Sequence, residues 1–191
     1  MENRYSIDSK DREKLLIKPL FKILFIDLAV IIFIGIIYEF DFKVILWPLI
    51  GIFSFTLIFY ILPLVLLYRN YLKYNSCCEL IFDFNKDETI NIRFSSSNKE
   101  ITFNEADILK INSNLSFTEY DKRMAWFFWD YLFFYNELVL SNNERIIISS
   151  LLCDKLLIHL NNTKINRVRR FFPMIRTVGN NAYNTTGSMV K

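Results

Sequence analysis

The chain has 191 residues, of which 52% are hydrophobic and 17% aromatic. This length accommodates one modest domain and an anchor, and the apolar fraction is high for a soluble protein of this size. A formal net charge of only +3 argues against a protein that binds nucleic acid.

Two apolar runs near the N-terminus predict a transmembrane hairpin over residues 20–74. The runs cover residues 20–38 and 44–68, and roughly 20 apolar residues in a helix cross a bilayer. The stretch YEFDFKV, residues 38–44, is predicted to be the turn between them. Buried helices of a soluble protein carry polar residues along one face, and neither run does. A cleaved signal peptide is also not expected, because the first run is too long and follows a charged leader.

The charges around the two runs predict their orientation. Residues 1–19 form a leader rich in Lys and Arg, and Arg69 and Lys73 follow the second run. The turn contains Lys43 beside two carboxylates. The positive-inside rule therefore places both termini in the cytoplasm and the tip of the hairpin outside the inner (plasma) membrane.

Asp27 is a carboxylate within the first run. An ionisable residue inside a membrane span is by default a candidate functional site. The second run has no further ionisable group that could form a proton relay with it. The favoured interpretation is a structural polar contact between the helices, or between copies in a homo-oligomer. Conceivable partners in the second run are Ser54, Thr56 and Tyr60. Two prolines, Pro48 and Pro63, are expected to bend this second helix.

From residue 75 onward, short alternating runs replace the long apolar ones. ELIFDF and TINIRF flank the polar turn NKDE, and LFFYNELVL and RIIISSLL flank SNNE, so each pair predicts a β-hairpin. Further strands are predicted in EITFN, in DILKINSNLSF and in the long run from Met124 to Leu140. Strands that follow one another without a helical period between them favour an antiparallel sheet or barrel. After Ser150, the spacing of the leucines predicts one or two helical segments.

Three stretches, LIFDFNKDETINIRF, ITFNEADILKI and YNELVLSNNERIIISSLL, carry a resemblance to a known family. Together with the hairpin they resemble small bacterial membrane proteins that have a pleckstrin-homology-like (PH-like) domain. The resemblance implies a strongly bent, seven-stranded antiparallel sheet capped by a C-terminal helix, and it brings no catalytic residues. The expected fold is therefore an α+β membrane protein, in which the hairpin precedes a PH-like domain at residues 75–176. The remaining residues, 177–191, are expected to form a disordered polar tail.

The aromatic stretch WFFWDYLFFY, residues 126–135, has three possible interpretations. Its rings could lie at the bilayer interface, where Trp and Tyr concentrate. They could form a surface that binds a protein partner. They could also belong to a long central strand that is covered on both faces. The candidate contact residues are Trp126, Trp129 and Tyr131.

A second candidate surface follows in the basic segment KINRVRRFFPMIR. A helix here would place an apolar stripe beside cations and could lie on an anionic inner leaflet. An ordinary capping helix with a solvated polar side fits the same pattern. The candidate membrane-contacting cations are Lys164, Arg167, Arg169, Arg170 and Arg176.

The sequence contains none of the common catalytic or nucleotide-binding motifs. His159 is the single histidine, and Cys77, Cys78 and Cys153 lack the C-x-x-C spacing of metal or redox sites. We therefore predict no enzyme activity, metal or cofactor. The turn NKDE is net acidic, so the phosphoinositide specificity of better-known PH domains, which use a basic loop, is not expected here.

The predicted function is a non-enzymatic, membrane-anchored cytoplasmic module that contacts inner-leaflet lipid or a membrane protein partner. The alternative is an accessory subunit of a transporter or envelope-stress complex.

Overall fold

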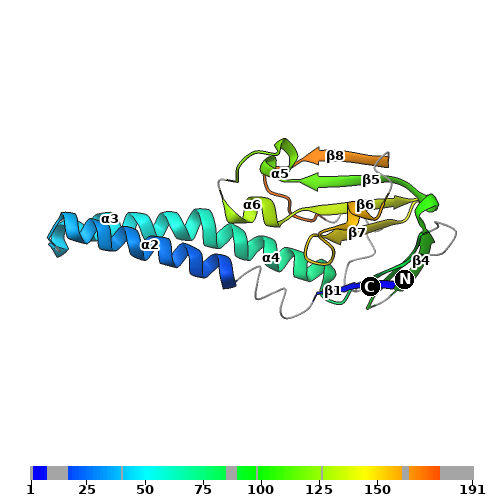
Figure 1. Cartoon of the computed structure of the whole chain (residues 1–191), viewed down its shortest axis with the longest axis horizontal. Helices are drawn as coiled ribbons and strands as arrows, with labels where there is room; N and C mark the ends of the chain where they lie inside the picture. Colours follow the sequence, from blue (N-terminus) through cyan, green and yellow to red (C-terminus); the bar gives the residue numbers. More distant parts are fainter. Residues whose placement is uncertain are drawn as a thin grey trace, which may run out of the picture.

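The computed structural model describes residues 2–7, 17–39, 41–84, 90–97, 99–125, 127–160 and 164–176. In these ranges the chain forms a long helical hairpin and a β-domain at the open end of the hairpin (Figure 1). The turn NKDE, Trp126 and the predicted polar tail lie outside the described residues.

The hairpin consists of α2 (Lys18–Ile37) and a longer second arm. The second arm contains α3 (Phe42–Thr56), the π-helix η2 (Leu57–Ile61) and α4 (Leu62–Asn75). Both arms are long and apolar enough to cross a membrane, and only 11% of the most apolar window of each is buried within the protein. The second arm continues past the predicted end at residue 68 because an apolar stripe persists at helical spacing. This stripe consists of Leu64, Leu67, Tyr71 and Tyr74.

The first sheet is antiparallel, with strand order β1-β2-β3-β4. The strands are β1 (Glu2–Ser6), β2 (Glu79–Phe84), β3 (Ile90–Ser96) and β4 (Lys99–Asn104). The leader therefore contributes a strand to the β-domain, which the sequence had not suggested. β1 pairs with the free edge of β2, with Tyr5 opposite Leu80, and its backbone groups are satisfied there.

The second sheet has the order β7-β6-β5-β8. Its strands are β5 (Ile108–Leu115), β6 (Tyr135–Leu140), β7 (Arg145–Ser149) and β8 (Ile165–Arg169). The predicted C-terminal helix is wrong, because this segment forms β8, which runs parallel to β5. β5 would otherwise present an unpaired edge, and β8 covers it. In the described part of the chain, eight strands in two sheets thus replace the predicted single seven-stranded sheet.

Short helices connect these strands. They are η3 (Glu105–Asp107), α5 (Phe117–Asp121), α6 (Phe128–Leu132) and η4 (Leu156–Ile158). The strand predicted from Met124 to Leu140 is therefore wrong in its first half, since α6 precedes β6. The helical segments predicted after Ser150 are reduced to the single turn of η4 in the described part of the chain.

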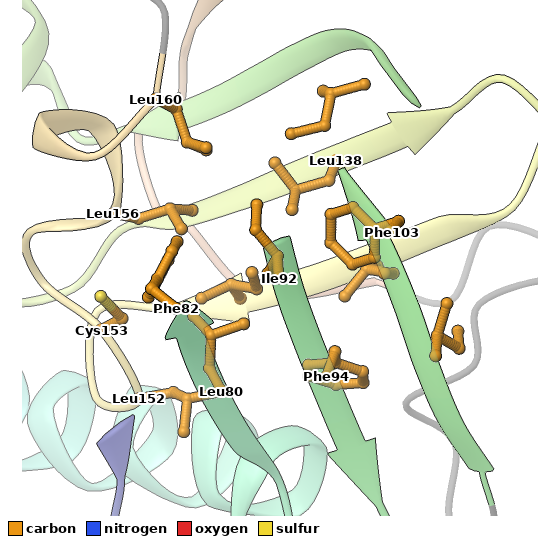
Figure 2. Close-up of a cluster of buried hydrophobic side chains, with 14 of the residues drawn as sticks. Leu80, Phe82, Ile92, Phe94, Phe103, Leu138, Leu152, Cys153, Leu156 and Leu160 are labelled. Carbon is orange, nitrogen blue, oxygen red and sulfur yellow. The ribbon is translucent and has the colours of Figure 1, made fainter. Parts of the chain in front are cut away.

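The main core lies between the two sheets (Figure 2). Alternate residues of β2 and β3 point into it, including the fully buried Leu80, Phe82 and Ile92. Leu138 enters from β6, and the segment after β7 closes one end with Leu152 and Leu156. β3 and β4 bury every second side chain, as their alternating sequences predict, whereas β7 buries consecutive residues because the second sheet is covered on both faces.

Candidate functional site at the junction of hairpin and domain

A second cluster of buried side chains joins the hairpin to the outer face of the second sheet. We call it the junction cluster. Its members come from α4, from α6 and the residues just after it, from β6, from β7 and the residues just after it, and from the C-terminal segment. They are Leu64, Leu67, Tyr71, Tyr74, Trp129, Phe133, Tyr135, Ile147, Leu151 and Ile175. The second sheet is therefore covered on both faces, and α4 is part of the packed structure of the domain.

Asn75 connects the last turn of α4 to strand β7. Its side-chain Nδ2 donates to the carbonyl of Ile147 at 3.1 Å, and its Oδ1 accepts from the backbone N–H of Ser149 at 3.1 Å. Asn75 is fully buried. β7 is an edge strand, and the amide of Asn75 satisfies its outward backbone groups as a neighbouring strand would.

The C-terminal segment after β8 returns to α4 and is held there by polar contacts. Tyr71 donates its hydroxyl to the carbonyl of Pro173 at 2.7 Å. Asn70 donates to the carbonyl of Ile175 at 3.1 Å and accepts from its N–H at 2.8 Å. These paired bonds fix the segment against the helix, so the base of the hairpin contacts three separate parts of the domain.

Trp129 contacts the hairpin at the π-helix η2, which is nearer to the hairpin tip than α4 is. Its Nε1 donates to the carbonyl of Phe59 at 2.9 Å. In a regular helix this carbonyl would accept from the residue four positions later, but that residue is Pro63, which has no N–H. The indole therefore supplies a donor where proline removed one. Trp129 is 6% exposed, so of the three predicted aromatic residues it is a core residue.

An aromatic stack extends from Trp129 along the hairpin. Phe127 stacks on Trp129 with ring centroids 5.5 Å apart and lies 5.2 Å from the ring of Tyr60, edge to face. Tyr131, in contrast, is 45% exposed. The segment that carries these rings thus lies beside the middle of the second arm. Trp126, the third predicted contact, lies outside the described residues.

Asp27 faces the second arm of the hairpin. Of the three conceivable partners, Thr56 makes the contact, donating Oγ1 to Asp27 Oδ1 at 3.1 Å. The two residues also line a cavity of about 610 Å³ beside the hairpin, together with Phe127 and Tyr131.

The basic residues of the C-terminal segment do not share one helical face. Arg169 forms an ion pair with Asp121 at 2.6 Å and lies 4.2 Å above the ring of Phe117. Arg170 donates to Asn114 Oδ1 at 3.1 Å, and Lys164 donates to the carbonyl of Glu105 at 3.3 Å. The two remaining candidates, Arg167 and Arg176, are exposed.

The cysteines and the histidine are spread through the domain. Burial raises the pKa of the Cys153 thiol to about 12 and also raises the pKa of Cys78, whereas Cys77 is exposed. His159 Nε2 lies 3.0 Å from the hydroxyl of Tyr5, which ties β1 to the segment after β7. Among the described residues no group of three or more His, Cys, Asp or Glu side chains could hold a metal ion.

Two packed sheets and a helical hairpin joined to the second of them define an α+β protein. The family model described as PH domain matches residues 4–159, so the chain belongs to the PH domain family. The match begins within β1 and includes the hairpin, which agrees with the pairing of the leader with β2. PH domains are generally non-catalytic interaction modules. No curated protein and no solved structure matches the chain.

Proposed function

We propose that the protein is a membrane-anchored, non-enzymatic PH-domain module in which the hairpin crosses the inner membrane and holds the domain against the cytoplasmic leaflet. The observation that carries this proposal is the exposure of the hairpin. Large apolar side chains project from both arms without protein cover, among them Phe25 at 73% and Trp47 at 75% exposure. Apolar surface of this extent is stable when hydrocarbon surrounds it.

The length of the second arm supports a specific depth in the bilayer. From the start of α3 at Phe42, a rise of 1.5 Å per residue places Phe59 about 25 Å along the helix. The hydrocarbon layer is about 30 Å thick, so Phe59, Tyr60 and the rings of the α6 segment reach the inner interface. Aromatic side chains concentrate at this level. α4, which follows the π-helix, then passes through the headgroup region to the domain.

The junction between hairpin and domain is proposed to determine how the anchor positions the domain at the membrane. The hairpin keeps the domain next to the leaflet, so that weak contacts with a lipid or a membrane protein become effectively intramolecular. Because the junction cluster, Asn75 and Trp129 fix the domain to the hairpin, the module presents one defined face to the bilayer.

The basic residues are proposed to contribute to that face. Arg167 and Arg176 are exposed, and each cation close to an anionic leaflet contributes about 1 kcal/mol. Arg169, Arg170 and Lys164 also have partners within the protein, so we expect them to contribute less. This surface is formed by strand β8 and the segment after it, in place of the amphipathic helix expected from the sequence.

Thiol labelling in intact cells tests the anchor and its orientation. Cys77 is exposed on the domain side, whereas Cys78 and Cys153 are buried and their raised pKa values disfavour the reactive thiolate. A membrane-impermeant maleimide should label Cys77 only after permeabilisation. A cysteine introduced by Glu39→Cys, at the hairpin tip, should be labelled from outside the intact cell.

The protein should also stay in the membrane pellet after extraction with alkaline carbonate. Release by carbonate would refute the anchor. Labelling of Cys77 in intact cells would refute the orientation and leave the anchor in place.

A further inference from the structure

The cavity beside the hairpin has features that the anchor alone does not require. It is bounded by α2, by the end of α3 and the π-helix, and by the segment that carries Ala125, Phe127 and Tyr131. Its volume of about 610 Å³ lies in the range of sites that bind small molecules. Apart from Asp27, Thr56 and two tyrosines, its lining is apolar.

Asp27 supplies the carboxylate in this lining. Its hydrogen bond comes from Thr56, and none of the ion pairs among the described residues involves Asp27. The described residues that line the cavity include no Lys or Arg. A carboxylate in apolar surroundings is costly unless a cation or further donors approach it. Among the described residues the carboxylate of Asp27 therefore has no cationic partner, and the cavity favours a ligand with a positive charge.

Gly51 enlarges the cavity from the side of α3. A Cβ atom built at this position meets no atom within 4 Å. Glycine within a helix costs about 1 kcal/mol relative to alanine, and close approach to another backbone is a common reason for it. No such approach is made here within the described chain. The glycine thus keeps open a space that a side chain would fill.

We infer that this cavity binds an amphiphilic amine, a molecule with an apolar body and one cationic nitrogen that pairs with Asp27. The inference rests on the proposed membrane module and deepens it by naming a ligand class. The apolar body would lie against Ile26, Phe55 and Phe127, and the protonated amine would donate to the oxygens of Asp27. A ligand of this kind reaches the cavity from the bilayer, where amphiphiles concentrate.

The shape of the site favours a small molecule over a helix of a partner protein. Helices associate in membranes through faces that pack closely over several turns. Here Ala125, Phe127 and Tyr131 border the cavity together with both arms of the hairpin, and the lining on α2 runs only from Ile23 to Val30, about two helical turns. A single-chain amine fits these limits, and a second helix would have to displace Phe127 and Tyr131.

Binding of dodecylamine to the full-length protein in detergent micelles tests the inference. Native mass spectrometry measures the fraction of protein that retains one ligand, with 1-dodecanol and dodecanoic acid as neutral and anionic comparisons. We expect at least about tenfold stronger retention of the amine than of the alcohol, as for one charge-assisted hydrogen bond. The assay does not require insertion into a bilayer, so its outcome is independent of the labelling test of the anchor.

Two variants address the charge and the space separately. Asp27→Asn keeps the size of the side chain and an oxygen for Thr56, and it should reduce amine retention about tenfold. Gly51→Leu fills the cavity without a clash at Cβ and should reduce retention of all three ligands. The matched controls are Glu39→Gln at the hairpin tip and Ala29→Leu on the exposed side of α2, which should bind as the wild type does. Equal retention of amine and alcohol by the wild type, or unchanged retention in either cavity variant, would overturn the inference.

Discussion

Replacing Asn75 by alanine should destabilise the protein more than the small loss of side-chain volume suggests, because the amide side chain forms hydrogen bonds with two backbone groups of β7. Asn75→Ala removes the donor to the carbonyl of Ile147 and the acceptor for the N–H of Ser149 in a fully buried location. Each unsatisfied buried group costs about 1 to 3 kcal/mol. For two such groups, the expected loss in the free energy of unfolding is therefore about 2 to 6 kcal/mol.

Two measurements in detergent micelles examine this prediction. Thermal unfolding followed by circular dichroism should show a melting temperature lower by about 10 °C or more, since 1 kcal/mol corresponds to several degrees in a domain of this size. Hydrogen exchange should report faster exchange at the amide of Ser149, while amides in the centre of the first sheet keep their protection.

Asn91→Ala on β3 is the matched control, because Asn91 is only partly buried and lies in the other sheet. It should change the melting temperature by little. Asn75→Asp provides an intermediate case, since a carboxylate accepts from Ser149 but cannot donate to Ile147. The reasoning is refuted if Asn75→Ala unfolds within about 0.5 kcal/mol of the wild type and the exchange of Ser149 is unchanged.

Three further predictions concern other contacts. Trp129→Phe keeps an aromatic ring but removes the donor to the carbonyl of Phe59, so stability should fall by about 1 kcal/mol in the same thermal assay; an unchanged melting temperature would show that the indole N–H contributes nothing. Phe82→Ala removes a fully buried ring between the sheets and should cost about 3 to 5 kcal/mol, whereas a loss below 1 kcal/mol would contradict the packing of the core. A hydrogen-bonded ion pair with Arg4 holds the pKa of Glu79 below its usual range. The ion pair therefore stabilises the folded protein at neutral pH. This stabilisation is lost as the pH falls from the usual carboxyl range through the lowered pKa. An NMR titration of Arg4→Gln should show a higher pKa for Glu79, and the same value in both proteins would exclude the pair as its cause.

The local hairpins of the β-domain were predictable because their signal is contained in adjacent residues. Leu80, Phe82 and Phe84 recur at every second position before the turn, and Ile92 and Phe94 alternate with polar residues after it. The structure pairs these two runs, with Leu80 opposite Phe94 and Phe82 opposite Ile92. The hairpin of β6 and β7 was predictable from two apolar runs that flank the Asn-rich turn SNNE. Here neighbouring strands pair through a short turn, so period and turn chemistry are sufficient.

The edge strands β1 and β8 were not predictable, because their partners lie far away in the sequence. β1 has a single aromatic residue, Tyr5, among polar ones, and the whole hairpin separates it from β2. β8 combines Ile165 and Val168 with charged residues, a pattern that also fits a helix. In both cases the free edge of a distant strand decides the conformation, since that edge offers backbone partners that a local pattern cannot reveal.

The candidate site likewise combines features that the sequence predicts with features that depend on the tertiary structure. The sequence by itself determined that Asp27 lies in an apolar run, that an aromatic stretch precedes β6, and that Thr56 could reach the carboxylate. Only the tertiary structure decided that Trp129 donates to the hairpin, that Arg169 is paired, and that one cavity joins Asp27 to Phe127. Composition and period are properties of neighbouring residues, whereas a cavity depends on how two arms of a hairpin and a distant loop pack in space.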